Sequence, residues 1–247
     1  MTSDFAPGNY RFIPAVFQYS AGAAALPGYE VERVRFDKMP RLADGFARIA
    51  EYIKAAGRPL TSFCACELRS PAAFTDQGFL EFNQHYVKTL AEWRIYDGKT
   101  NPVARSNVCP EIDPPSEPSF YAFSFVRPST NATPSFVIAG SGEALEGAGP
   151  YSERTVRYRD LSADGIKDKV RHVVGAMESR MGAFGFGWKD ATAAQVYTIR
   201  DFHHVVADEL VKRGAVRSGL TWHFARPPVI DLEYEMDCRR VTREIVI

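Results

Sequence analysis

The sequence of 247 residues has few of the features that mark membrane, secreted or nucleic-acid-binding proteins. No run approaches the roughly 20 apolar residues that a membrane span needs, and the start, MTSDFAPGNY, lacks the basic and apolar regions of a signal peptide. Its 30 basic and 30 acidic residues cancel and no basic block occurs, so neither nucleic acid nor a membrane is an expected partner. The cytoplasm is the expected location.

Cysteine is scarce, and its spacing does not favour a metal site. Of the four cysteines, Cys64 and Cys66 lie two apart in an expected strand and share a face, whereas Cys109 and Cys238 are isolated. No second pair or histidine cluster accompanies them, so reduced, buried thiols are expected. The sequence also lacks a P-loop, a dinucleotide fingerprint and a nucleophile elbow, and we therefore expect neither metal nor cofactor.

A duplication organises the chain. VRFDKMPRLADGFARIAEYIKAAG, from Val34, and VRYRDLSADGIKDKVRHVVGAM, from Val156, each lead through glycine to a segment that ends in LR or IR. A cluster of Pro, Ser, Thr and Asn in residues 126–135 favours a boundary between two compact units, 1–127 and 128–247. Each unit is predicted to have the order ββαβαββ, which makes the fold class α+β.

Periodicity supports these units. Apolar residues at steps of three and four predict four helices, whose faces carry Leu42, Phe46, Ile49 and Ile53; Phe79, Phe82, Tyr86, Leu90 and Trp93, with Asn83; Ile166, Val170, Val173, Met177 and Met181; and Phe202, Val206 and Leu210. Alternating or apolar runs predict strands in residues 10–20, 29–36, 62–68, 104–108, 120–126, 136–144, 154–160, 192–199, 220–228 and 230–237. The AGAAALPG segment is expected to be the turn between the first two strands.

Several phrases resemble the Rid/YjgF family of reactive intermediate deaminases, as two family domains in tandem. They are AAG at Ala55–Gly57, FLEFNQHY at Phe79–Tyr86, PVARS at Pro102–Ser106, IAGSGEA at Ile138–Ala144 and ARPPVIDLEYEMD at Ala225–Asp237. The resemblance implies a chorismate-mutase-like fold that forms a homotrimer with pockets between neighbouring domains. In such pockets an arginine pairs with a substrate carboxylate while water attacks an imine or enamine carbon and ammonia leaves.

The resemblance also implies the site. The family arginine maps onto Arg105, and the remaining mapped positions are Asn83, Ser141, Gly142 and Glu233. Two positions depart from the pattern, since Asn107 stands where many of these deaminases have Cys and Glu143 replaces a Gln. The second half has no clear counterpart of the arginine segment, so one composite pocket is expected, with Arg105 facing groups of the second unit.

The residues themselves support some of these roles. A guanidinium offers a planar fork of donors that matches a carboxylate, which suits Arg105 to a small acid or to a salt bridge. Asn83, on an apolar helix face, needs partners in the backbone or in a pocket. In the last strand Asp231, Glu233, Glu235 and Asp237 alternate with apolar residues. That acidic face is either solvated, or it brings Glu233 or Glu235 to the pocket as a proton donor or base, a role for which Glu143 also qualifies.

The favoured function is hydrolytic deamination of a small imine or enamine acid of the 2-aminoacrylate or 2-aminomuconate type. The alternatives are a chorismate-type hydrolase or lyase on the same fold, and a non-catalytic module that binds small acids. The substrate partner is a small carboxylate in each case. A homotrimer is also expected because Tyr121, Phe123 and Phe125 predict an apolar sheet face in need of cover.

Overall fold

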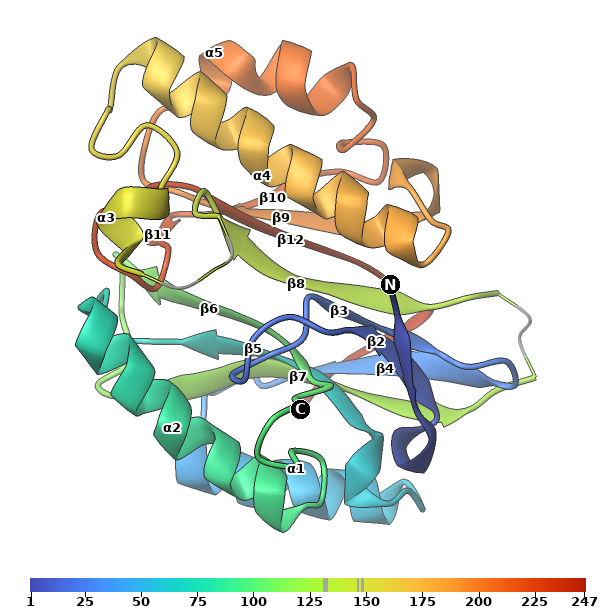
Figure 1. Ribbon diagram of the computed structural model, residues 1–247. Helices are drawn as coiled ribbons and strands as arrows, with labels where there is room; N and C mark the ends of the chain where they lie inside the picture. The colour runs from blue at the N-terminus through green and yellow to red at the C-terminus, as the bar shows by residue number, and fades with distance from the viewer. Residues whose placement is uncertain (131–132, 146, 148) are drawn as a thin grey trace.

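The computed structural model describes all residues except 131, 132, 146 and 148, and it has two sheets with helices outside each (Figure 1). The strands are β1 Ser3–Phe5, β2 Tyr10–Ile13, β3 Gly22–Ala25, β4 Tyr29–Arg35, β5 Phe63–Arg69, β6 Ala104–Pro110, β7 Ser119–Pro128, β8 Phe136–Gly142, β9 Ala193–Tyr197, β10 Thr221–His223, β11 Ala225–Arg226, β12 Glu235–Arg240 and β13 Arg243–Val246. The helices are α1 Leu42–Ala55, α2 Asp76–Glu92, α3 Tyr151–Arg154, α4 Ala163–Ala183 and α5 His203–Val205, followed by a π-helical stretch, Val206–Val211, and there are short 3₁₀ turns at Ala6–Gly8, Leu60–Ser62 and Trp188–Asp190.

The helices form where the periodicity predicts them. On α1, Phe46, Ile49 and Ile53 are buried against the sheet of the first half. The helix α2 begins at the hydroxyl of Thr75, which accepts a hydrogen bond from the Gly78 N–H. The helix α4 begins in the same way at Ser162 and buries the predicted apolar stripe, from Ile166 to Met181, beneath the second sheet. Each sheet therefore has helices on one face, which confirms the α+β class.

Strands cross between the halves. The seven-stranded sheet has the order β1-β2-β3-β8-β12-β9-β10, so the chain's first three strands belong to the sheet of the second half. The six-stranded sheet, β11-β6-β5-β7-β4-β13, receives two strands from the end of the chain, and β13 runs parallel to β4. Because each sheet is completed by the other half, the two sheets are tied together at both ends of the chain. The boundary between the units 1–127 and 128–247 remains a prediction.

Two predicted segments have other structures. Residues 21–28, expected as a turn, contain β3, whose glycine and alanines fit closely between β2 and β8. Residues 154–160, expected as a strand, end helix α3 and continue as turns. There Arg157 and Arg159 adopt positive φ values of 50° and 56°, and their side chains pair with Asp168 and Asp231. The charged side chains thus bind neighbouring loops and helix α4, and only an isolated bridge joins Thr155 to Ala144.

Two faces that could have been exposed are covered. Of the two alternatives for the acidic face of residues 230–237, solvation is wrong, because Glu233, Glu235 and Asp237 are only 8%, 4% and 5% exposed. The face that carries Phe123 and Phe125 is covered by α1, so it does not require a neighbouring chain. In the part of the chain that the structure describes, no helix is long and apolar enough to cross a membrane.

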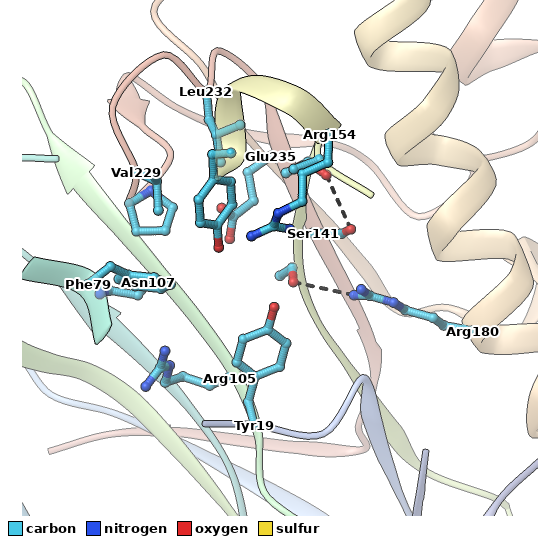
Figure 2. A pocket seen from close by; sticks show the side chains of 15 residues that line it. Tyr19, Phe79, Arg105, Asn107, Ser141, Arg154, Arg180, Val229, Leu232 and Glu235 are labelled. Carbon is cyan, nitrogen blue, oxygen red and sulfur yellow. Dashed lines mark hydrogen bonds between the residues drawn. The ribbon is translucent and has the colours of Figure 1, made fainter. Parts of the chain in front are cut away.

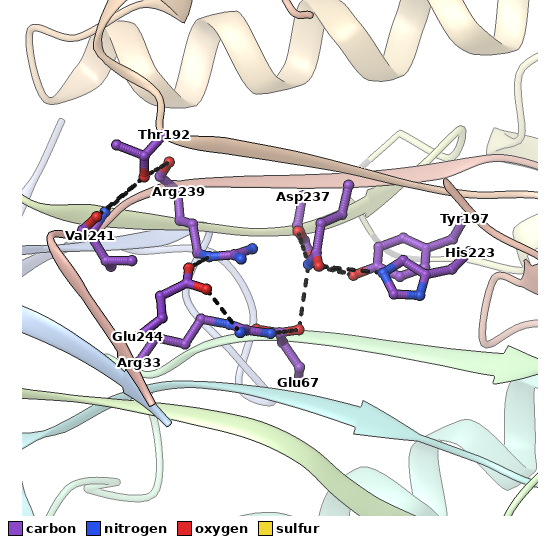
Figure 3. Close-up of polar contacts among 10 residues, drawn as sticks. Arg33, Glu67, Thr192, Tyr197, His223, Asp237, Arg239, Val241 and Glu244 are labelled. Atoms are coloured by element: carbon purple, nitrogen blue, oxygen red, sulfur yellow. Dashed lines mark hydrogen bonds and ion pairs between the residues drawn. The ribbon is translucent and has the colours of Figure 1, made fainter. Parts of the chain in front are cut away.

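The two sheets face each other across a layer of paired charges (Figure 3). Arg33 on β4 donates to both carboxylate oxygens of Glu67 on β5, at 2.6 and 2.9 Å. Arg33 also contacts Glu244 on β13 at 3.5 Å, and the other oxygen of Glu244 accepts from Arg239 on β12 at 2.6 Å. Burial by itself raises the pKa of Glu67, but the guanidinium of Arg33 outweighs burial and holds that pKa well below its ordinary value.

A glutamine closes the layer from the second sheet. The side-chain amide of Gln195 on β9 donates to Asp237 on β12 at 2.8 Å and to Glu67 on β5 at 3.4 Å. Asp237 also accepts from the Tyr197 hydroxyl at 2.8 Å. The polar layer therefore connects strands of both sheets, and each buried charge has a partner of opposite charge or a hydrogen-bond donor.

We expect Glu67→Gln to lower the free energy of unfolding by about 3–5 kcal/mol, because Arg33 would remain buried without its main counter-charge. Chemical denaturation followed by circular dichroism measures this change. The matched control is Asp208→Asn, which breaks the exposed pair of Asp208 with Lys212 and should change the midpoint little. Equal, small effects of both substitutions would show that the layer does not hold the sheets together.

Candidate active site

A cavity lies where the two halves meet, at the ends of β6, β8 and β12 (Figure 2). Its walls come from both halves of the chain and from helices α3 and α4. The lining residues are Tyr19, Phe79, Arg105, Asn107, Gly140, Ser141, Gly142, Ala144, Tyr151, Arg154, Arg180, Pro228, Val229, Leu232 and Glu235. Four of the seven predicted site residues are in this set, namely Arg105, Asn107, Ser141 and Gly142.

Arg105, near the start of β6, is held by α2 through one guanidinium nitrogen, while another has no partner among the described residues. Its Nη2 donates to Asn83 Oδ1 on α2 at 2.6 Å, and its guanidinium lies 4.7 Å from the centre of the Tyr86 ring. The side chain is 3% exposed, and among the described residues its Nη1 has no hydrogen-bond partner. Asn83 thus lies behind Arg105 and orients it, and does not line the cavity.

Asn107 presents a second donor from the same face of β6. Its Oδ1 accepts a hydrogen bond from the Ser70 hydroxyl at 2.9 Å, which turns the amide nitrogen away from Ser70. Nδ2 is buried and has no partner among the described residues. Buried donors without partners are rare in folded proteins and indicate where an acceptor binds. Arg105 and Asn107 together suit the two oxygens of a carboxylate.

Glu235, the first residue of β12, is the acid that lines the cavity. Its carboxylate has room because position 140 is glycine, since a Cβ there would lie 2.1 Å from Glu235 Oε1 and 2.9 Å from the Ser106 Cβ. Burial raises the pKa of Glu235 well above its ordinary value, and the negative charges of Asp237 and Glu143 raise it further. The raised pKa favours the protonated form of Glu235, which suits this side chain to proton donation in the cavity.

The other two predicted acids lie outside the cavity. Glu143 forms a fully buried pair with Lys169 on α4 at 3.2 Å, and it accepts hydrogen bonds from the backbone N–H groups of Glu233 and Tyr234. Burial raises the pKa of Glu143 although Lys169 opposes this shift. The Glu233 carboxylate pairs with Arg200 at 2.7 Å, away from the lining residues. Both contacts are structural, so neither acid is brought to Arg105.

Several lining residues are not evident from motifs. Arg180 occupies the buried side of α4 and donates Nη1 to the carbonyls of Ala139 and Gly140, at 3.0 and 3.3 Å. Like Asn83, it is a polar residue on an otherwise apolar helix stripe, and this signal could have identified it. Arg154 and Tyr151 come from α3, and of these two only Arg154 lies in the segment predicted as a strand. Tyr19 lies in an irregular segment between β2 and β3.

The cysteines are free and buried, as predicted. Burial raises the pKa of the Cys66 thiol to about 12, and its sulfur lies 3.3 Å from the Tyr86 hydroxyl. Such thiols remain protonated and are poor nucleophiles. Within the described residues, no group of three or more His, Cys, Asp and Glu side chains is arranged to hold a metal ion.

Comparison with known proteins gives a match over nearly the whole chain. Residues 2–245 match the model of a family described as 2-aminomuconate deaminase CnbZ. A 2-amino-5-chloromuconate deaminase from Comamonas testosteroni is 53% identical over 245 residues, which cover 98% of each chain. Among solved structures, a chorismatase is 13% identical with a TM-score of 0.47 over 90% of this chain and 77% of its own. The YjgF gene product of E. coli is 17% identical with a TM-score of 0.33, over 44% of this chain and 81% of its own.

We expect Glu143→Gln to impair stability more than catalysis. The substitution keeps the size of the side chain but leaves the Lys169 ammonium buried without a counter-charge, which typically costs about 3–5 kcal/mol. Denaturation curves measure the loss, and kcat per folded molecule should stay close to the normal value. A normal unfolding free energy combined with a large fall in kcat would instead assign Glu143 a role in proton transfer.

Proposed function

The chain belongs to the 2-aminomuconate deaminase family, and we propose that it hydrolytically removes the amino group of an aminomuconate-type substrate. The match over residues 2–245 and the relative at 53% identity support this function. The observation that carries it is that Arg105 Nη1 and Asn107 Nδ2, two donors without a partner among the described residues, meet the acid Glu235, whose pKa is raised, in one cavity. These groups supply a carboxylate anchor and a proton, which this reaction requires.

The reaction follows from these groups. The substrate carboxylate next to the amino-bearing carbon binds Arg105 and Asn107. Glu235 protonates the enamine carbon next to the amino-bearing carbon, which gives an electrophilic iminium ion. Water then adds to the iminium carbon and loses one proton to the amino nitrogen and one to the Glu235 carboxylate. The C–N bond breaks as the C=O bond forms, which releases ammonia and leaves an oxo acid. One water is consumed and one ammonia is produced, so the atoms balance without an oxidant.

The alternatives have less support. A chorismate-type hydrolase would use the same carboxylate anchor and acid, but the family match and the curated relative point to aminomuconate-type substrates. A binding module without catalysis would have no need for a protonated acid beside the anchor. A hydrolase that needs no metal or organic cofactor remains our proposal, and the homotrimer and the cytoplasmic location remain predictions.

Arg105 is expected to provide most of the carboxylate binding. Arg105→Ala should lower kcat/KM about 30- to 4000-fold, as the loss of a buried charged contact worth about 2–5 kcal/mol implies. Arg105→Lys should restore little, because an ammonium cannot donate both to Asn83 and to a carboxylate in the planar geometry. Ammonia release from 2-aminomuconate measures the effect. Arg41→Lys, on an exposed arginine, is the matched control, and near-normal turnover by Arg105→Ala would place the anchor elsewhere.

Glu235 should give the reaction an alkaline limit. If its protonated form donates the proton, kcat/KM is constant at low pH and falls as pH rises through the raised pKa. Glu235→Gln should lower kcat by about 10²- to 10⁴-fold and remove the fall of kcat/KM at high pH, because the amide does not titrate. Glu233→Gln breaks only the pair with Arg200, so both the rate and the fall at high pH should remain. If kcat/KM of Glu235→Gln still falls at high pH, the assignment is contradicted.

A further inference from the structure

The cavity carries more positive charge than one carboxylate requires. Among the described residues that line it, the charged or ionisable acids and bases other than tyrosine are Arg105, Arg154, Arg180 and Glu235. Burial raises the pKa of Glu235, which opposes its charged form. Arg105 and Arg154 are separate cations of this lining, and a ligand with a single carboxylate could pair with only one of them. The lining therefore favours a dianion.

Arg154 lies on the opposite side of the cavity from Arg105 (Figure 2). Its Nη1 donates to the Leu145 carbonyl at 2.6 Å and its Nε to the Gly149 carbonyl at 3.3 Å. The guanidinium stacks on the Tyr151 ring at 3.8 Å. These contacts orient the group at the cavity wall, and none of the carboxylates that the structure describes is paired with it.

The helix that carries Arg154 is fixed to the first half of the chain. The Tyr151 N–H donates to Asp76 at the start of α2 at 3.1 Å. The Tyr151 ring packs beside Phe79 and Leu232, which also line the cavity. Because Phe79 and Asn83 project from the same helix α2, the position of Arg154 is set by the element that also orients Arg105.

Arg180 is less suited to bind a second carboxylate. Its Nη1 already donates to two backbone carbonyls of β8, where it supports the wall that contains Gly140. Arg154 and Arg105 are thus the two cations best placed for a ligand with charges at its two ends. Muconate-type acids are six-carbon chains with a carboxylate at each end.

We propose that Arg154 binds the distal carboxylate of the substrate and makes the enzyme selective for linear dicarboxylic enamines and imines over monocarboxylic ones. This inference rests on the proposed function. In this arrangement Arg105 and Asn107 hold the carboxylate next to the reacting carbon, and Arg154 holds the carboxylate at the far end of the chain. The reacting carbon then lies between the two anchors, on the side of the cavity that contains Glu235.

A matched pair of imines tests the selectivity. An amino acid oxidase generates 2-iminoadipate from 2-aminoadipate and 2-iminohexanoate from norleucine, and the two products differ only in the distal carboxylate. We expect Arg154→Gln to lower kcat/KM for 2-iminoadipate about 10- to 100-fold, as expected for a charged hydrogen bond. The value for 2-iminohexanoate should change by less than about threefold. Arg154→Lys, which keeps the charge, should lie between wild type and Arg154→Gln for the dicarboxylate.

The control variant is Arg159→Gln, because Arg159 is exposed, pairs with Asp231 and does not line the cavity. Arg159→Gln should leave kcat/KM unchanged for both imines. If Arg154→Gln lowered kcat/KM equally for the two imines, the proposal would be overturned and Arg154 would have a role in holding α3. The proposal would also be overturned if kcat/KM fell for neither imine. Circular dichroism verifies that each variant is folded.

Binding of unreactive acids separates this inference from the proposed function. In calorimetry, wild type should bind adipate at least about tenfold more tightly than hexanoate, and Arg154→Gln should lose that difference. If wild type turns over neither imine nor 2-aminomuconate but retains this binding preference, the proposed reaction fails while the role of Arg154 stands. If wild type binds the two acids equally, the proposal for Arg154 fails whatever the reaction is.

Discussion

The layer of buried charges between the sheets is the constraint on which the site depends. Arg33 and Glu67 belong to one sheet, Gln195 and Asp237 to the other, and Glu244 on β13 connects Arg33 to Arg239. Charges buried at this depth require partners, so the two sheets have few ways to face each other without leaving one unpaired. The cavity lies beside this layer, since Glu235 of β12 lines the cavity and Asp237 of the same strand belongs to the layer.

The same layer explains the acid in the cavity. Glu235 and Asp237 lie two residues apart on β12 and share a face, but their surroundings differ. Asp237 accepts hydrogen bonds from Gln195 and Tyr197, whereas Glu235 borders the cavity with negative charges nearby. Two carboxyl groups from one strand therefore have different surroundings, and the proton-donor role that we propose for Glu235 follows from what it faces.

The duplicated halves give one cavity because their matching positions carry different residues. When the LR and IR segments are aligned, Tyr197 matches Cys66, and their strand partners are His223 and Arg105. His223 stacks on Tyr197 at 5.0 Å and meets the edge of Tyr121 at 6.0 Å. Burial, helped by the charge of Arg69, lowers the pKa of His223 to about 4, so the second half has a neutral ring where the first half has Arg105.

The amino-acid sequence by itself determined the helices and the internal repeat, and it indicated Arg105 as the proposed anchor. The apolar stripes of α1, α2 and α4 depend on local periodicity, and Arg105 belongs to a contiguous motif. Tertiary structure decided which acid lines the same cavity as Arg105. Alternation places Glu233 and Glu235 on one face but does not specify where the cavity lies along the strand. Tertiary structure also decided the roles of Glu143 and Arg154, which depend on Lys169 and on the docking of α3 against Asp76. Contacts between residues so distant in sequence arise from packing, which no local pattern encodes.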